Sequence, residues 1–213
     1  MGEVDIERAL KGLAADRRAP AGERAREAEG AARRVAERAV AEGLADITYA
    51  PLDSPFGTLL GAATSRGLIR LAFPEESIDS VLERLAMRVS PRIVEARAGL
   101  DPVQRELEQY FRGERREFRI ALDWALIGQF GRRVLRATSA IPYGGVSSYA
   151  EVAAEAGSPR GSRAAGNALG SNPIPIVVPC HRVLHSGGGL GGYGGGLHRK
   201  RWLLDLEGAG APA

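Results

Sequence analysis

Hydrophobic and polar positions divide the chain into two stretches of different character. Residues 1–46 contain no aromatic side chain, and most of their apolar positions are alanine. Because alanine favours helix but buries little apolar surface, we expect one or two helices without a strong core, interrupted at Gly12, 19–22 and Gly43. No residue pattern in this extension indicates a chemistry.

From Ile47 the pattern changes to short runs of β-type residues separated by turn-forming residues. These runs are 47–54, 55–65 and 67–74. They predict an antiparallel hairpin or small sheet. Apolar residues at helical spacing then predict helices at 77–89 and 101–114. We therefore expect a small α/β domain with an antiparallel sheet at 47–122.

The second half of the chain is dominated by short helical patterns. After a strand-like run at 117–123, the helical segments are 127–141, 147–157 and 162–171. The last two are joined by a glycine-containing turn, which is typical of a helix-turn-helix. Helical hairpins also occur in proteins that never contact DNA. We expect a mostly helical, winged helix-turn-helix-like domain at 123–208 and a tail at 209–213.

Length and composition predict a globular protein of one large or two small domains. The chain has 213 residues, of which 44% are hydrophobic. No run of eighteen apolar residues occurs, and the first residues are charged from Glu3, so we expect neither a membrane span nor a secretory signal. The expected location is the cytoplasm.

Positive charge is concentrated in the second half of the chain. The whole sequence has a net charge of +3, but residues 132–204 hold nine Lys or Arg against two acids, Glu151 and Glu155. This imbalance favours a polyanionic partner. Arginines that only solubilise a surface would give the same count, because charge alone sets no specificity.

The chain contains one cysteine, Cys180, and three histidines. We therefore expect no internal disulfide, no metal site and no cofactor. Cys180 ends an extended apolar segment punctuated by prolines and is followed at once by His181 and Arg182. A thiol beside a base on a rigid support is the arrangement that a nucleophile needs. A buried structural thiol beside a core histidine is the alternative.

A base must accept the thiol proton, because only the thiolate attacks carbon and a free cysteine has a pKa near about 8.5. His181 could do so if a carboxylate held its other ring nitrogen, and the candidates on the last helix are Glu207 and Asp205. The glycine run at 187–196 lacks the lysine pattern of a phosphate loop. It predicts a loop whose backbone approaches a ligand closely.

The segment IPIVVPCHRV, with Pro-Cys-His-Arg at 179–182, resembles the active-site motif of the O6-alkylguanine-DNA alkyltransferases, also called methylated-DNA-protein-cysteine methyltransferases. The likeness continues in the segments 52–73, 141–157 and 191–208. It spans about 47–208 and implies a ribonuclease H-like sheet followed by a DNA-binding domain. Some relatives hold zinc near the N-terminus, and this chain has no cysteine or histidine before Cys180 to do so.

The resemblance implies direct-reversal DNA repair. The alkyl group of O6-alkylguanine, or of O4-alkylthymine, would move irreversibly to Cys180. The target nucleotide would flip out of double-stranded DNA, which a bacterial, monomeric protein would bind through the minor groove. Each molecule would act once, because no second thiol can release the thioether.

Residue roles follow from the same resemblance. Cys180 would accept the alkyl group, His181 would activate it through a water, Glu207 would orient His181 and Asn172 would hold the active-site turn. Tyr149 would help to rotate the nucleotide and would hydrogen-bond the guanine. The other residues implied around the guanine are Val183, whose carbonyl would read the exocyclic amine together with that of Cys180, then Tyr193, Gly194 and Lys200.

DNA contacts are also implied. Arg163 resembles the arginine that enters the duplex where the flipped base was, and the small residues after it would let the helix approach the minor groove. Close packing in the core is the alternative for some of these small residues. The expected DNA-binding residues are Tyr149, Arg163, Ala164, Ala165, Gly166 and Arg182.

Three other functions compete with repair. A non-repairing sensor of alkylated guanine is disfavoured because such relatives replace the cysteine, which is present here as Cys180. A Cys-His hydrolase would leave Arg163 and Tyr149 without a role. A DNA-binding regulator would bind a defined sequence whether or not the cysteine is intact.

Overall fold

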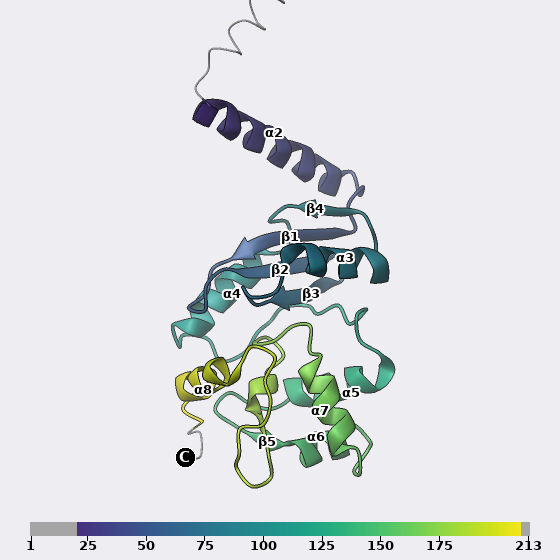
Figure 1. The fold of residues 1–213 in the computed structure, drawn as a ribbon, viewed down its shortest axis with the longest axis vertical. Coiled ribbons are helices and arrows are strands. Elements are labelled where there is room, and N and C mark those ends of the chain that lie inside the picture. The colour runs from purple at the N-terminus through teal and green to yellow at the C-terminus, as the bar shows by residue number, and fades with distance from the viewer. Residues whose placement is uncertain (1–20, 210–213) are drawn as a thin grey trace, which may run out of the picture.

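The computed structural model describes residues 21–209, and the expected breaks before Ala21 lie outside this range. A single helix, α2 (Ala21–Ala41), projects from one end of the molecule beside the short strand β4 (Figure 1). None of the α2 side chains that the structure describes is buried, as expected of an alanine-rich helix. Gly43, with a positive φ of 70°, lies in the turn that follows.

A four-stranded sheet forms the first half of the molecule. Its strands are β1 (Ile47–Leu52), β2 (Leu59–Thr64), β3 (Gly67–Ala72) and β4 (Ile93–Glu95), in the order β3-β2-β1-β4. The predicted antiparallel pairing holds for β1 with β2 and for β2 with β3. The fourth strand, β4, was not predicted, and the sheet is not wholly antiparallel as expected. β4 runs parallel to β1 because a helical crossover brings the chain back in the direction of β3.

The predicted helices cover the two faces of this sheet. In α3 (Ile78–Arg88), Val81 and Leu85 pack in one core cluster with Ile47 and Ile69. The other helix, α4 (Asp101–Phe111), packs in a second cluster with residues such as Leu52, Leu59 and Leu71. Because neighbouring strand residues face opposite sides, one sheet supports both clusters.

The strand-like run at 117–123 makes only a single bridge to the sheet, between Leu68 and Leu122. The Leu68 N–H donates to the Ala121 carbonyl at 2.8 Å, and the Asp123 N–H donates to the Leu68 carbonyl at 2.9 Å. Gly67, at φ 130°, makes this approach possible, since a Cβ there would lie 2.1 Å from the Ala121 oxygen. After this contact with the edge strand β3, the chain continues into the second half of the molecule.

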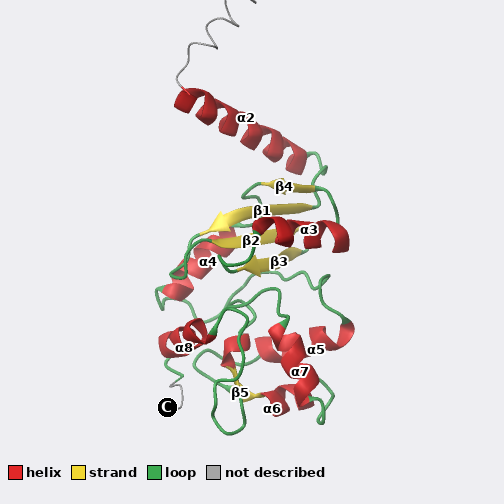
Figure 2. Cartoon of the chain, in the orientation of Figure 1, coloured by secondary structure: helices red, strands yellow, loops and turns green. Residues whose placement is uncertain are grey.

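The regular structure of the second half is helical, as expected, apart from two strands of two residues each, and long loops connect its elements (Figure 2). Its elements are α5 (Gln129–Ser139), β5 (Ser147–Ser148), α6 (Tyr149–Glu155), α7 (Ser162–Gly170), the 3-10 turn η1 (Cys180–Arg182), β6 (Val183–Leu184) and α8 (Leu197–Leu206). A reciprocal capping box of Ser148 and Glu151 starts α6. The pair α6–α7 is the predicted helical hairpin, and a wing beside it stays a prediction.

One hydrophobic core joins the two halves. Tyr110 of α4 and Leu71 of β3 belong to the same buried cluster as Val134 of α5 and Leu203 of α8. The Leu71 N–H donates to the Pro173 carbonyl at 2.8 Å. Segments of the second half are therefore held directly by the sheet. Within residues 21–209, no helix is long and apolar enough to cross a membrane.

Candidate active site

A buried turn delivers Cys180. The segment before it includes Ile176, a non-glycine residue at φ 74°, and a bridge between Pro175 and Val178. Such a backbone conformation persists only where the surroundings hold it. The η1 turn begins at Cys180, whose side chain is 6% exposed. The thiol therefore sits on a rigid, desolvated support, as the prolines of the sequence predicted.

Asn172 holds both this turn and the thiol. Its Nδ2 donates to the Val178 carbonyl at 2.9 Å and to the Cys180 Sγ at 3.1 Å, and its Oδ1 accepts from the Ile174 N–H at 3.0 Å. A donor aimed at sulfur favours the thiolate over the thiol. Asn172 thus occupies the position expected of it.

Burial raises the pKa of Cys180 to about 11, although the Asn172 hydrogen bond and the positive charge of Lys200 act in the opposite direction. At neutral pH the isolated thiol is consequently protonated. Attack on carbon requires a base that takes this proton.

His181 is built to act as that base. Its side chain is fully buried, and its Nε2 lies 2.9 Å from Glu207 Oε1. Burial lowers the pKa of His181, an effect that Glu207 only partly opposes. With Nε2–H donated to the carboxylate, Nδ1 carries the lone pair, and it has no hydrogen-bond partner in the protein. Asp205, the other candidate carboxylate, is exposed.

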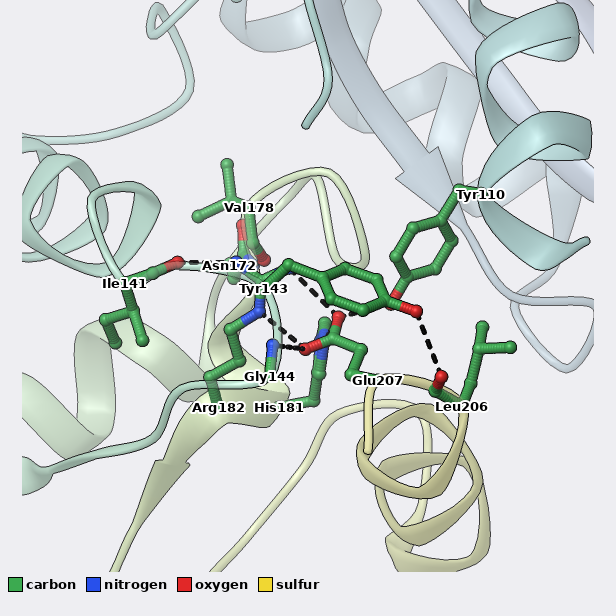
Figure 3. A network of polar contacts seen from close by, with 10 residues as sticks. All are labelled: Tyr110, Ile141, Tyr143, Gly144, Asn172, Val178, His181, Arg182, Leu206 and Glu207. Carbon is green, nitrogen blue, oxygen red and sulfur yellow. Dashed lines mark hydrogen bonds and ion pairs between the residues drawn. The ribbon is translucent and has the colours of Figure 1, made fainter. Parts of the chain in front are cut away.

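Glu207 lies at the centre of a network of donors (Figure 3). Arg182 donates from Nε to Oε2 and from Nη2 to Oε1, each at 2.9 Å, and the Tyr110 hydroxyl donates to Oε1 at 2.6 Å. Burial raises the pKa of Glu207, but the hydrogen bonds from His181, Arg182 and Tyr110 overcome that effect and lower it to about 2. The carboxylate is a fixed anion beside the imidazole.

Cys180 is reached through a cavity of about 720 Å³ opened by α6 and α7. Its lining includes Tyr149, the first residue of α6, and Arg163 at the start of α7. It also includes Gly166, Tyr193 and Gly194, so it gathers five further residues that the sequence singled out around Cys180. A second cavity, of about 710 Å³, meets Cys180 from the side of α3 and the first turn of α5.

Lys200 lies behind this pocket and not in it. Its side chain is fully buried, and its Nζ donates to the Val183 carbonyl at 2.6 Å and to the Leu190 carbonyl. Burial lowers the pKa of Lys200 to about 8. The ammonium group ties the glycine-rich loop to the segment after Cys180. No cluster of three His, Cys, Asp or Glu that could hold a metal occurs in the described part of the chain.

Comparisons with known proteins identify the family of the chain. The family described as 6-O-methylguanine DNA methyltransferase matches twice, its ribonuclease-like domain at residues 47–124 and its DNA-binding domain at residues 129–209. The chain belongs to this methyltransferase family. The family predicted from Pro-Cys-His-Arg is thereby confirmed, and residues 1–46 lie outside both matches.

Individual relatives are similar over most of their own length. The methylated-DNA–protein-cysteine methyltransferase of Mycolicibacterium paratuberculosis is 45% identical over 168 residues, which are 78% of this chain and 96% of that protein. An inducible one from Bacillus subtilis is 38% identical over 68% of this chain and 82% of its own. The solved structure of Mycobacterium tuberculosis OGT in complex with DNA has a TM-score of 0.65 at 41% identity, covering 78% of this chain and 96% of that chain.

Two of the residues expected to contact DNA are buried. Arg182 is 6% exposed, and its guanidinium is occupied by Glu207 and by the Ile141 carbonyl, which accepts from Nη1 at 2.5 Å. Ala165 is fully buried and packs in the core. Arg163 and Ala164 are exposed, so the face of α7 that they mark remains open to a partner.

No sequence pattern indicated a role for Tyr110 in the site. It lies in the apolar stripe of α4 with Val103 and Leu107, and an aromatic residue at that spacing predicts a position in the hydrophobic core. Its hydroxyl nevertheless meets Glu207, 97 positions further along the chain. Only the fold brings the two together.

Proposed function

We propose that the chain repairs O6-alkylguanine in double-stranded DNA by moving the alkyl group to Cys180. The observation that carries this proposal is the buried pair of His181 and Glu207 behind the single cysteine, at a cavity opened by the helical hairpin. Membership of a methyltransferase family whose relatives are named for protein-cysteine methylation supports it.

The chemistry is a displacement at the alkyl carbon. The Cys180 proton passes to Nδ1 of His181 through a water, and the thiolate Sγ forms a bond to the alkyl carbon as the bond from that carbon to O6 breaks. The guanine leaves as an anion and recovers one proton, so that thiol and O6-alkylguanine become thioether and guanine. Tyr149 and Gly194 line the cavity. In this proposal the Tyr149 hydroxyl and the Gly194 N–H donate to the charge that develops on the base.

The target nucleotide must leave the base stack. A thiol with 6% exposure inside a cavity cannot reach an O6 atom that faces a groove of intact duplex. Arg163 stands exposed at the mouth of that cavity and can occupy the space of the displaced base. Exposed Ala164 and the half-buried Gly166 let α7 approach the narrow minor groove.

One molecule repairs one lesion. Cys180 is the only cysteine of the sequence, so no second thiol can remove the alkyl group. We infer that the protein works as a monomer without a cofactor in the bacterial cytoplasm, since every group that the displacement uses comes from this chain.

Base analysis of the DNA tests the repair step. Duplex carrying one O6-methylguanine is incubated with increasing amounts of protein, and the bases are released and quantified. We expect guanine to replace O6-methylguanine mole for mole with protein, and no conversion with Cys180→Ser. Conversion that exceeds the protein supplied would contradict single use, and loss of O6-methylguanine without gain of guanine would contradict direct reversal.

A further inference from the structure

We propose that Tyr110 is a positioning residue of the alkyl transfer, whose hydroxyl holds the Glu207 carboxylate so that His181 stays neutral and free to accept the Cys180 proton. This inference rests on the proposed function. It assigns to the first half of the chain, otherwise a scaffold, a part in activating the thiol.

The contact crosses between the two halves of the molecule. Tyr110 lies on α4, which packs against one face of the sheet, and Figure 3 shows its ring reaching Glu207 from the side opposite His181 and Arg182. Both side chains are buried, and the hydroxyl oxygen lies 2.6 Å from Glu207 Oε1. The other donors to this carboxylate, His181, Arg182 and the Gly144 N–H, belong to the second half.

The Tyr110 ring is fixed in place by its aromatic neighbours. It packs edge-on against Tyr143 at 6.1 Å and against Phe111 at 5.5 Å, and it is tilted against Phe118 at 5.1 Å. Burial, with Glu207 adding to it, raises the pKa of Tyr110 far above that of an ordinary tyrosine. The hydroxyl therefore keeps its proton and acts as a permanent donor.

The same oxygen, Glu207 Oε1, accepts from Tyr110, from Arg182 Nη2 and from His181 Nε2. Each donor withdraws negative charge from this oxygen. The carboxylate then stabilises a doubly protonated, positively charged imidazole less strongly. Without the hydroxyl, the carboxylate would stabilise the imidazolium more strongly. More of His181 would then be protonated before the reaction and unable to take the thiol proton.

Other ionisable groups lie close to His181 and Glu207, and they set the pH range in which the effect of the Tyr110 hydroxyl on His181 protonation can be measured alone. They are Arg182 and Lys200, which oppose protonation of His181, together with Cys180, Tyr193 and Tyr143. Lys200 has a pKa of about 8, so below about pH 7.5 it stays mostly charged. In the acidic range, therefore, His181 is the group of this set whose protonation changes.

Tyr110→Phe removes the hydroxyl and keeps the ring. Tyr143→Phe is the matched control, because Tyr143 packs against Tyr110 and its hydroxyl donates to the Leu206 carbonyl at 2.9 Å and not to Glu207. The first measurement is the rate of Cys180 alkylation by iodoacetamide from about pH 5 to about pH 7.5, read by intact mass. The second is single-turnover methyl transfer from an O6-methylguanine duplex over the same range.

For Tyr110→Phe we expect the acid limb of both profiles to move to higher pH, with rates about tenfold lower on that limb and converging with the wild type at the alkaline end. Tyr143→Phe should follow the wild-type profile. Unchanged profiles in Tyr110→Phe would overturn the inference. So would a loss that is equal at every pH, which is the mark of a structural defect alone.

The two measurements separate this inference from the proposed function. Failure of the wild type to take methyl groups from DNA would contradict the proposed function. The iodoacetamide profiles would still decide whether Tyr110 acts on the base, since they need no DNA.

Discussion

The Asn172 amide nitrogen lies 3.1 Å from the Cys180 sulfur and 2.9 Å from the Val178 carbonyl oxygen. A single side chain thus supports the strained turn and the reacting atom at once. Its own oxygen is occupied by the Ile174 N–H, which fixes the direction of the amide donor. The geometry of the turn and the state of the thiol are coupled through this residue.

Asn172→Ala should therefore affect both reactivity and stability. We expect the apparent pKa of Cys180 to rise further and its alkylation by iodoacetamide to slow, because the thiolate loses a donor. Unfolding should require about 1–3 kcal/mol less, since buried backbone groups lose their partner. Asn167→Ala, at an exposed position of α7, is the control for both measurements. An unchanged thiol profile in Asn172→Ala would contradict its role.

Glu207→Gln should slow methyl transfer by roughly ten- to a hundredfold, because a neutral amide cannot stabilise the imidazolium that forms as the thiol proton arrives. This loss outweighs the smaller fraction of His181 that is protonated before the reaction. Affinity for lesion-free duplex should stay within about twofold of the wild type, since the residue is buried away from the DNA face. Asp205→Asn, exposed on α8, should transfer normally. Parallel losses of rate and affinity in Glu207→Gln would contradict the assignment.

Acid should weaken the fold through Glu207. Its pKa in the folded protein is about 2, below the value of 4.5 for an exposed glutamate, so its contribution is complete above about pH 4.5 and is lost as the pH falls through about 2. The shift corresponds to about 3 kcal/mol. Urea unfolding between those pH values should show a steeper loss for the wild type than for Glu207→Gln. Identical slopes would refute the prediction.

Arg163→Ala should act on the duplex and not on the thiol. We expect weaker duplex binding, a salt dependence reduced by about one counterion, and slower transfer from duplex with little change for a single-stranded oligonucleotide. Arg160→Ala provides a comparison at another exposed arginine just before α7. Equal rates of duplex repair in Arg163→Ala and wild type would remove the residue from the site.

Local patterns predicted most of the fold. The helices α3 and α4 carry periodic apolar stripes, and the antiparallel strands β1 to β3 are joined by short turns. These local patterns are enough to predict the helices and the strand pairing. The parallel strand β4 has three residues and no buried side chain. Its pairing depends on the helical crossover and could not be read from its own residues.

In the active site, too, features set by neighbouring residues could be predicted, and contacts between distant residues could not. The Cys180-His181 pair is adjacent in sequence, and two candidate carboxylates, Asp205 and Glu207, lie near the end of the last helix, so a carboxylate on the imidazole could be expected. Arg182 was misread because a guanidinium in a basic stretch looks the same whether it faces DNA or a buried carboxylate. Tyr110 was missed because its contact with Glu207 exists only after both halves have packed together.

Intact-protein mass spectrometry tests the central claim most directly. The full chain and Cys180→Ser are each incubated with excess duplex carrying one O6-methylguanine, and the modified residue is mapped by fragmentation. The account predicts one added methyl group on the wild type, located on Cys180 and never exceeding one per chain, with none on the variant. Tight binding of the damaged duplex without any added mass would contradict alkyl transfer and would identify the protein as a sensor of the lesion.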